Sequence, residues 1–341
     1  MSEKGQLNLK DIAKKLGVSV STVSRVLSGQ ANKYRISKKT ERAILDKIVR
    51  LNFVPNELAR GLRLNQTHTL GLIISDISNQ FFSSIARYIE MEARKSGYSI
   101  LLCDNEDNTD IEIESLNLML SRKVDGIIIS PVGQISEHLD SIHKSGMPIV
   151  LVDRYFPDLE IPFVTSDSFV GAYDAVSYLI EKGHHRIACI QGARGASSSI
   201  DRVRGYEEAL KSHNIAIDTK LIVGNGFDQR NGYIETKLLL KMENRPTAIF
   251  SVGNLISFGA ICAITEEKLN IPKDISIVSF DEQPYLAYLS TPLTTVAQQN
   301  SEMGQIAVKL LLDQIESGSK PVSGGIFLPT KLIVRKSVEK I

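Results

Sequence analysis

The sequence predicts an α/β protein that carries a small helical module ahead of its sheets. From about Thr69 onward, short β-rich apolar runs alternate with helix-length amphipathic stretches, a pattern typical of parallel sheets covered by helices on both faces. Before Thr69 only short helical patterns occur. Residues 1–65 carry 14 Lys and Arg against 5 Asp and Glu, a net charge of +9, while the other 276 residues carry 26 against 34, a net charge of −8. This asymmetry indicates a basic module joined to a larger acidic body.

Three short helical patterns, and a fourth marginal one over 57–64, precede the α/β region. The first two are separated by the turn Gly17-Val18-Ser19, which is the arrangement of a helix-turn-helix. Outward positions of the second helix are short, polar or basic, as they must be if the helix is to enter the major groove of DNA. The alternative, a surface helix pair inside a larger helical domain, is disfavoured by the surrounding positive charge. The expected capping residues are Asn8, Ser19 and Ser37.

The α/β region is expected to form two lobes. About nine strands are predicted, which is large for one open sheet, and the polar, proline-containing segment 153–165 interrupts their series. The predicted strands include 70–74, 99–103, 126–129, 149–152, 187–190, 221–223, 248–252 and 275–280. The predicted helices between them cover 82–94, 111–120, 135–144, 171–181, 202–212, 231–240 and 256–268.

Several classes of function are disfavoured by the sequence. No apolar stretch approaches the roughly 18–20 residues of a membrane span, and the polar start of the chain argues against a secretory signal. Cys103, Cys189 and Cys262 have no metal-ligand or redox spacing, so we expect buried thiols in a reducing compartment. Phosphate-loop, nucleophile-elbow and dinucleotide-binding motifs are absent from the sequence. We therefore expect no catalysis, no metal site and no cofactor.

Short motifs are spread over nearly the whole chain. They are Asp11-Ile12-Ala13, Thr22-Val23-Ser24-Arg25-Val26-Leu27, Pro55-Asn56, Val124-Asp125-Gly126, Phe280-Asp281 and Thr291-Pro292-Leu293-Thr294-Thr295-Val296. Together they resemble the lactose-repressor family of bacterial transcription regulators. The resemblance implies a three-helix, helix-turn-helix headpiece that reads DNA, followed by a two-lobed, periplasmic-binding-protein-like (type I) effector domain of doubly wound parallel sheets.

The same resemblance implies domain boundaries. The headpiece would cover 1–54, a hinge helix and linker 55–68, and the effector-binding and dimerisation domain 69–341. Lobe one would comprise about 69–163 and 297–324, and lobe two about 164–293 and 325–341, with chain crossings near Val164, Leu293 and Gly325.

The resemblance implies that Val20, Ser21 and Arg25 on the second helix face base edges. Arg25 is suited to bidentate contact with guanine, worth roughly 1–3 kcal/mol of discrimination, and the alternative is a phosphate contact. Val20 suits the methyl group of thymine. Residues expected to support these contacts or to bind the DNA backbone are Ser19, Thr22 and Ser24.

The loop between the second and third helices, Ser28 to Ile36, is about three residues longer than is usual in the family. It adds Lys33, Tyr34 and Arg35, which are able to contact phosphate groups. A longer solvated turn is an equally good interpretation.

Residues 55–64 resemble the family's hinge helix, which orders on operator DNA and inserts a leucine into the minor groove. Leu62 occupies the inserting position, and its alternative role is packing against a dimer partner. Flanking arginines suit the narrow, negative groove of A·T-rich steps. The minor-groove residues are Asn56, Ala59, Arg60, Leu62 and Arg63.

Ligands of parallel sheets bind at the carboxyl ends of strands, here in the crevice between the lobes. By resemblance, Arg202 and Asp281 contact the effector, and the alternative is an ion pair or helix cap. Core packing is the alternative for the aromatic residues. Asn254 stands where the family often has aspartate, and neither Arg154 nor His143 is assigned a site role. The expected effector-binding residues are Asp76, Phe81, Phe82, Arg202, Phe227, Asn254 and Asp281.

These features predict a sequence-specific transcriptional regulator, a repressor, whose affinity for its operator is controlled by a small carbohydrate effector. Its expected partners are near-palindromic double-stranded operator DNA, the effector and a second copy of the chain. The expected location is the bacterial cytoplasm, on the nucleoid when bound. The alternative is a ligand-independent architectural DNA-binding dimer with a degenerate effector domain.

Overall fold

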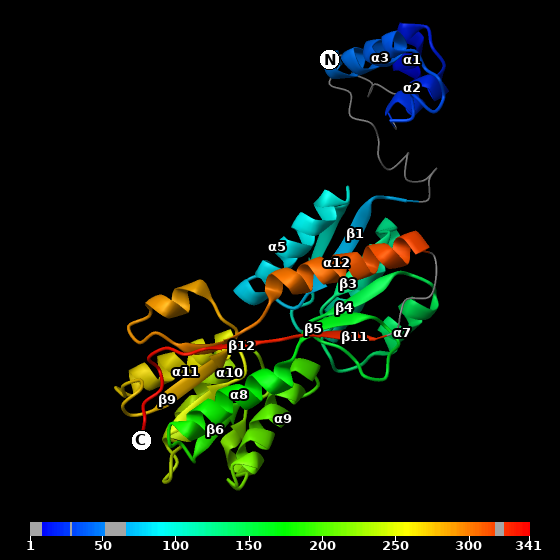
Figure 1. Cartoon of the computed structure of the whole chain (residues 1–341). Helices are drawn as coiled ribbons and strands as arrows, with labels where there is room; N and C mark the ends of the chain where they lie inside the picture. Colours follow the sequence, from blue (N-terminus) through cyan, green and yellow to red (C-terminus); the bar gives the residue numbers. More distant parts are fainter. Residues whose placement is uncertain (1–8, 28, 52–65, 318–323) are drawn as a thin grey trace, which may run out of the picture. The chain divides into compact units, whose positions relative to one another are not determined.

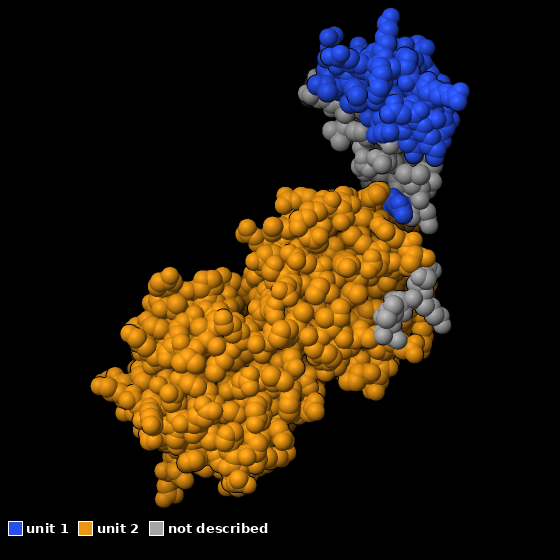
Figure 2. All heavy atoms as spheres, in the orientation of Figure 1, with its two compact units in different colours: residues 1–67 blue, residues 68–341 orange. Residues whose placement is uncertain are grey.

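The computed structural model of the chain describes residues 9–27, 29–51, 66–317 and 324–341 (Figure 1). The chain divides into two compact units, residues 1–67 and residues 68–341 (Figure 2). The expected hinge helix lies outside the described residues, as do all five of its minor-groove residues, Asn56, Ala59, Arg60, Leu62 and Arg63. Across the described ranges, no helix is long and apolar enough to span a membrane.

The first unit contains three described helices around a small apolar core. They are α1 (Leu9–Leu16), α2 (Val20–Leu27) and α3 (Lys38–Arg50). The caps predicted at Ser19 and Ser37 are confirmed, because their hydroxyl oxygens accept hydrogen bonds from the backbone N–H of Thr22 and Thr40, each at 3.1 Å. Gly17 adopts a φ of +63°, which turns the chain between α1 and α2. The buried residues that fix the crossing of the helices are Ile12, Ala13, Val23, Val26, Ala31 and Ile44.

The described residues of the second unit form two six-stranded sheets of matching order, β11-β5-β4-β3-β1-β2 and β12-β10-β9-β8-β6-β7. All pairs are parallel except β10 with β12, which is antiparallel. The strands of the first sheet are β1 (Thr69–Ile74), β2 (Ser99–Asp104), β3 (Gly126–Ile129), β4 (Ile149–Val152), β5 (Phe163–Ser166) and β11 (Gly325–Leu328). Those of the second are β6 (Ile187–Ile190), β7 (Ile222–Val223), β8 (Ala248–Ser251), β9 (Ser276–Phe280), β10 (Thr294–Ala297) and β12 (Lys331–Ile333).

Helices cover both faces of the first sheet. The helices of this lobe are α5 (Gln80–Lys95), α6 (Thr109–Arg122), α7 (Glu137–Lys144) and α12 (Asn300–Ser317). Figure 1 shows α5 and α12 together across one face. Side chains alternate along the strands: Leu70 and Leu72 of β1 belong to the cluster under α5 and α12, while Ile73 belongs to the cluster with Leu116 of α6. This burial on both faces explains the continuously apolar strands.

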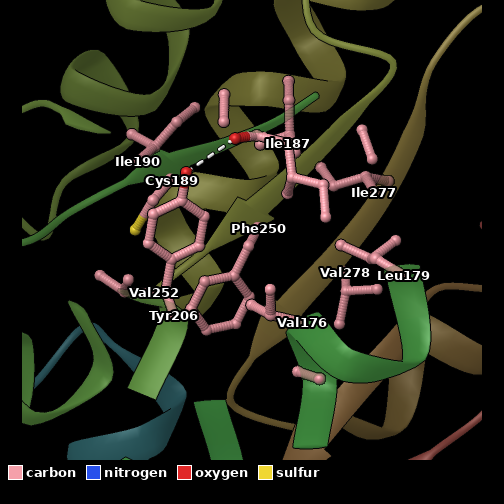
Figure 3. Packing of buried hydrophobic residues seen from close by; sticks show 14 of the residues in the cluster. Val176, Leu179, Ile187, Cys189, Ile190, Tyr206, Phe250, Val252, Ile277 and Val278 are labelled. Carbon is pink, nitrogen blue, oxygen red and sulfur yellow. Dashed lines mark hydrogen bonds between the residues drawn. The ribbon is translucent and has the colours of Figure 1, made fainter. Parts of the chain in front are cut away.

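The second lobe has one extended core beneath α8 (Ser168–Glu181), α9 (Ser197–Ser212), α10 (Gln229–Leu240) and α11 (Asn254–Glu266). Figure 3 shows Tyr206 of α9 inside it, with its hydroxyl group donating a hydrogen bond to the carbonyl oxygen of Ile187 at 2.8 Å. Cys189 is buried there as predicted, and burial raises the pKa of its thiol. The same prediction is wrong for Cys103 and Cys262, which are partly exposed, because one lies on the edge strand β2 and the other on a half-exposed part of α11.

The chain crosses between the lobes after residues 166, 297 and 328, a few residues later than expected. The strands β5, β10 and β11 belong to the sheets that the chain is leaving, because each pairs there with a neighbouring strand. Residues 164–166 and 325–328, expected in lobe two, therefore belong to the sheet of lobe one. The three crossings bring the carboxyl ends of both sheets to one cleft.

Candidate functional site

A small cavity lies between the two lobes at the carboxyl ends of their strands. Its volume is about 20 Å³, enough for about one water molecule. Six of the seven effector-binding residues expected from the sequence lie in its lining. The remaining one, Asp76, is not there, because its carboxylate accepts hydrogen bonds from the hydroxyl group of Ser78 (2.6 Å) and from the backbone N–H of Asn79 (3.2 Å) in the turn before α5. The lining consists of Asn79, Phe81, Phe82, Asp153, Arg154, Ser198, Arg202, Phe227, Asn254 and Asp281.

Arg154 of lobe one reaches into this cavity and is only 2% exposed. Its Nη1 atom donates to the Asp107 carboxylate (2.6 Å) and to the carbonyl oxygens of Pro131 (3.2 Å) and Val132 (3.3 Å). The guanidinium carbon lies 5.0 Å from the ring centroid of Phe227, which belongs to lobe two. Arg154, to which the sequence interpretation assigns no site role, therefore lines the same cavity as the expected effector residues. The place of Arg154 in the lining could have been predicted from the sequence, because Arg154 follows β4 closely and the carboxyl ends of strands line such clefts.

Arg202 of lobe two is buried on the opposite side of the cavity. Its Nη1 atom donates to the carbonyl oxygen of Val252 at 2.7 Å, and its guanidinium carbon lies 3.8 Å from the ring centroid of Phe280. Its Nη2 atom is 3.9 Å from Oδ1 of Asp281. Burial lowers the pKa of Arg202, while Asp281 and Asp153 oppose that effect.

Asp281 both lines the cavity and binds the start of α11. One carboxylate oxygen accepts from Nε2 of Gln298 at 2.5 Å, and the other accepts from the backbone N–H of Asn254 at 3.3 Å. The cap and ion-pair interpretation of Asp281 and its place in the cavity are therefore compatible. The carboxylate also presents a fixed acceptor to anything that enters the cleft.

Asp153 is the corresponding buried carboxyl group of lobe one. Burial raises its pKa to about 6, against the lowering effect of Arg154 and Arg202, and the carboxylates of Asp281 and Asp107 add to the increase. Because this value lies near neutral pH, the group can accept a hydrogen bond or, when protonated, donate one.

Direct contacts between the lobes hold the cleft closed. Nδ2 of Asn254 in lobe two donates to Oδ1 of Asn79 in lobe one at 2.9 Å. The backbone N–H of Tyr155 donates to the Ser197 hydroxyl oxygen at 2.9 Å. The backbones also approach closely, since a Cβ atom at Gly195 would lie 2.7 Å from the carbonyl oxygen of Gly133. The structure therefore describes the lobes in a closed arrangement.

The outward face of α2 is the second candidate surface. Val20 is 39% exposed and Ser21 is also exposed, while Arg25 is half-buried. The guanidinium carbon of Arg25 lies 3.9 Å from the ring centroid of Tyr34 in the long loop after α2. The hydroxyl oxygen of Ser19 lies 2.7 Å from that of Ser21 and 2.8 Å from that of Thr22, so these hydroxyl groups take part in the helix start. Lys33 and Arg35 of the loop are exposed and Ser24 is half-buried.

The described residues contain no group of three or more His, Cys, Asp or Glu side chains that could hold a metal ion.

The chain matches two family models. Residues 8–56 match the model of bacterial regulatory proteins of the lacI family, and residues 176–338 match that of the periplasmic binding protein-like domain. The HTH-type transcriptional repressor PurR of Haemophilus influenzae (strain PittEE) is 32% identical over 337 residues, which cover 98% of this chain and 99% of the relative. Catabolite control protein A of Priestia megaterium is 34% identical over 334 residues, with 98% and 99% covered.

Solved structures agree with these relatives. The lac repressor dimer bound to operator and the anti-inducer ONPF has a TM-score of 0.86 and 25% identity, with 98% of this chain and 99% of that chain covered. A LacI family transcriptional regulator from Enterococcus faecium with bound ribose has a TM-score of 0.72 and 30% identity, with 80% and 99% covered. The chain therefore belongs to the lacI family of bacterial regulatory proteins, and it is a DNA-binding transcription regulator and not an enzyme.

Proposed function

We propose that this regulator is a repressor whose affinity for operator DNA changes when a small carbohydrate binds between its lobes. The observation that carries this proposal is the cavity at the carboxyl ends of both sheets, where two buried arginines and two buried aspartates meet aromatic rings. Guanidinium and carboxylate groups form charge-assisted hydrogen bonds with hydroxyl groups, while Phe81 and Phe227 offer faces to C–H groups. The ribose-bound relative supports a ligand of this class.

The proposed effector residues are Phe81, Phe82, Arg202, Phe227, Asn254 and Asp281, to which we add Arg154. Because the small cavity has room for about one water molecule, a sugar requires the lobes to separate first. Opening breaks the hydrogen bond between Asn79 and Asn254. Contacts that form when the lobes close around the sugar have to compensate for this loss. Ligand binding is thereby coupled to lobe movement.

On the DNA side we propose that Val20, Ser21 and Arg25 read base edges from the major groove. Ser19, Thr22, Ser24, Lys33 and Arg35 then support the helix or bind phosphate groups. Val20 and Ser21 are exposed on one face of α2, whose other face is held by the buried Val23 and Val26. A helix fixed in this way can dock with its outward side chains toward a groove.

We also propose the domain division into a headpiece (1–54), a hinge helix and linker (55–68) and an effector-binding domain (69–341). Within the hinge, Leu62 inserts into the minor groove between Arg60 and Arg63, and Asn56 and Ala59 face the same groove. The chain acts as a homodimer on a near-palindromic operator, on the nucleoid in the cytoplasm. The lac repressor structure, a dimer bound to operator, supports this assembly by similarity.

A second candidate function is ligand-independent binding to DNA. It is favoured by one observation, namely that side chains of both lobes already fill the cleft and bond to each other. In that case the second unit would serve only to hold two headpieces together.

A thermal-shift screen against sugars and sugar phosphates separates the two functions. An effector at 100 times its Kd stabilises the folded state by about 2.7 kcal/mol. We expect a shift with at least one sugar for the wild-type chain and for the control Arg204→Met, whose side chain on α9 is 63% exposed. We expect a much smaller shift for Arg202→Met. If no compound shifts the wild-type chain, the carbohydrate proposal fails and the ligand-independent function is favoured.

Selection of bound duplexes from a randomised pool tests the DNA side. We expect the wild-type chain to select a near-palindromic site. Arg25→Ala should lower the preference for that site over scrambled DNA, by about 5- to 150-fold for each guanine contact. An unchanged preference at fixed salt would assign Arg25 to phosphate contact instead.

A further inference from the structure

The loop after α2 is fastened to the helical core at both of its ends. The backbone N–H of Gln30 donates to the carbonyl oxygen of Arg25 at 2.9 Å, and that of Ile36 donates to the carbonyl oxygen of Ala31 at 2.9 Å. Ala31 is only 2% exposed, and Ile36 packs against the same core. The residues between them are therefore held in a compact turn.

Tyr34 lies within this turn and folds back over α2. Its backbone N–H donates to the carbonyl oxygen of Gln30 at 3.2 Å, and its side chain remains 43% exposed. Its ring centroid is 3.9 Å from the guanidinium carbon of Arg25, which lies in the last turn of α2. Contact at this distance is a cation–π interaction with the ring face.

Stacking on a ring has a definite consequence for an arginine that reads a base. A guanidinium group that stacks on an aromatic face uses the ring for its plane and not for its N–H edge, and on DNA that edge can donate to O6 and N7 of guanine. The ring also restricts the rotamers of a long side chain that otherwise loses entropy when it binds. Tyr34 can therefore favour the bidentate contact without touching the DNA.

We propose that Tyr34 is a positioning residue that holds the guanidinium group of Arg25 for base reading. The inference rests on the proposed function of Arg25. It changes the role expected for Tyr34, from a phosphate contact to a residue that sharpens sequence discrimination through its neighbour. The hydroxyl group of Tyr34 is dispensable for this role, and the ring is not.

The test uses the full chain and two kinds of probe. The first is the tightest duplex that the wild-type chain selects from a randomised pool. The second is a set of duplexes in which each G·C pair of that site is replaced in turn by A·T. Dissociation constants are measured at one salt concentration for the wild type, Tyr34→Phe, Tyr34→Leu, Arg25→Ala and the double variant Arg25→Ala/Tyr34→Leu. Lys33→Ala, at the neighbouring exposed position, is the matched control.

We expect Tyr34→Leu to lower the preference for the guanine that Arg25 reads by about 2- to 5-fold for each half-site. Tyr34→Phe should retain the wild-type preference, because it keeps the ring. In the Arg25→Ala background, Tyr34→Leu should have no further effect on the preference. Lys33→Ala should weaken binding to all duplexes equally and leave the preference unchanged.

Three results would overturn the proposal. Equal losses for Tyr34→Phe and Tyr34→Leu would indicate a direct contact by the hydroxyl group. A loss for Tyr34→Leu that is the same on all duplexes would indicate a phosphate contact or a disturbed fold, and melting curves of the variants separate these two causes. If Arg25→Ala lowers the preference but Tyr34→Leu leaves it unchanged, the proposed role of Tyr34 is wrong and that of Arg25 remains. If Arg25→Ala leaves the preference unchanged, the proposed base-reading function fails as well.

Discussion

The two lobes of the second unit share one framework but place different charges at matching positions. β4 and β9 occupy the same place in the two strand orders, and each is followed by a buried aspartate with positive φ, +66° for Asp153 and +72° for Asp281. The next residue differs: Arg154 enters the cleft, whereas Glu282 pairs with Arg335 at 2.7 Å. The shared topology thus sets the positions of the two aspartates, and the sequence of each lobe determines which cations neutralise them.

The two cleft arginines are also held differently. Arg202 lies in a closed environment with a carbonyl oxygen, a phenylalanine ring and the buried Asp281. Arg154 pairs with Asp107, whose side chain is 37% exposed and hence solvated, and its Nε atom lies 3.7 Å from the carboxyl group of the buried Asp153. Loss of Arg202 leaves the buried Asp281 without its cation. Loss of Arg154 leaves the solvated Asp107 and the buried Asp153, whose raised pKa allows it to bind a proton and so lose its charge.

Arg202→Met should therefore have the largest effect on stability. We expect a loss of about 3–5 kcal/mol in the free energy of unfolding, because Asp281 stays buried without its cation. Urea unfolding of the full chain measures this, with Arg204→Met on the same helix as the exposed control. A loss of stability as small as that of the control would show that the hydrogen bonds from Gln298 and from the start of α11 stabilise the Asp281 carboxylate without Arg202.

Arg154→Met should cost less, about 1–3 kcal/mol. Its loss leaves the carbonyl oxygens of Pro131 and Val132 without this donor, but Asp107 remains solvated and the buried Asp153 can bind a proton. The same urea experiment ranks the two variants. If Arg154→Met is as destabilising as Arg202→Met, the proposed difference between the lobes is wrong.

The protonation of Asp153 should make the stability of the chain depend on pH. Because the pKa of Asp153 is raised from 3.8 to about 6, the folded state binds more protons than the unfolded state between about pH 4 and 6, so stability falls as pH rises through this range. Asp153→Asn removes this penalty and should stabilise the chain above pH 6, by about 1–3 kcal/mol, with the gain vanishing near pH 4. Asn also tolerates the positive φ.

Calorimetry between pH 4 and 7.5 on the wild type and Asp153→Asn measures this gain, and Asp281→Asn at pH 7 gives a comparison. Asp281→Asn should destabilise the chain at pH 7, because Arg202 then loses its anion. A gain for Asp153→Asn that does not depend on pH would contradict the account.

Removing a contact between the lobes should have the smallest effect on the free energy of unfolding. Asn254→Ala removes the hydrogen bond to Asn79 and should cost about 0.5–1.5 kcal/mol. Asn79→Ala should cost about 1 kcal/mol more, because the Asn79 side chain also accepts from the backbone N–H of Phe81 at the start of α5. Solution scattering should show a larger radius of gyration for both variants. Unchanged scattering would mean that the other contacts alone close the cleft.

Much of this architecture could be predicted from local patterns. The helix-turn-helix follows from capping serines, a glycine turn and apolar faces, and residues such as Arg202 and Asp281 follow from the rule that clefts form at carboxyl strand ends. The strands β5, β10 and β12 were harder to predict, since they are short and contain polar residues, so they produce no apolar run. Their pairing partners come from distant parts of the chain.

Other features depend on contacts that no pattern encodes. The rule for strand ends selects a whole loop, so it included Asp76, whose carboxylate bonds within its own turn, and it was not applied to Arg154. The stacking of Tyr34 on Arg25 depends on how a nine-residue loop folds between two anchored ends. Such a loop has no periodicity from which to predict its shape.

The central claim is that ligand binding in the cleft changes the affinity of the chain for DNA. The most direct test is a fluorescence anisotropy titration of the selected duplex with the full chain, with and without a saturating sugar found in the thermal-shift screen. We predict that the sugar changes the Kd for DNA by about 5- to 150-fold in the wild type. In Arg202→Met the same sugar should have little effect. An identical Kd with and without a sugar that is demonstrably bound would contradict the account.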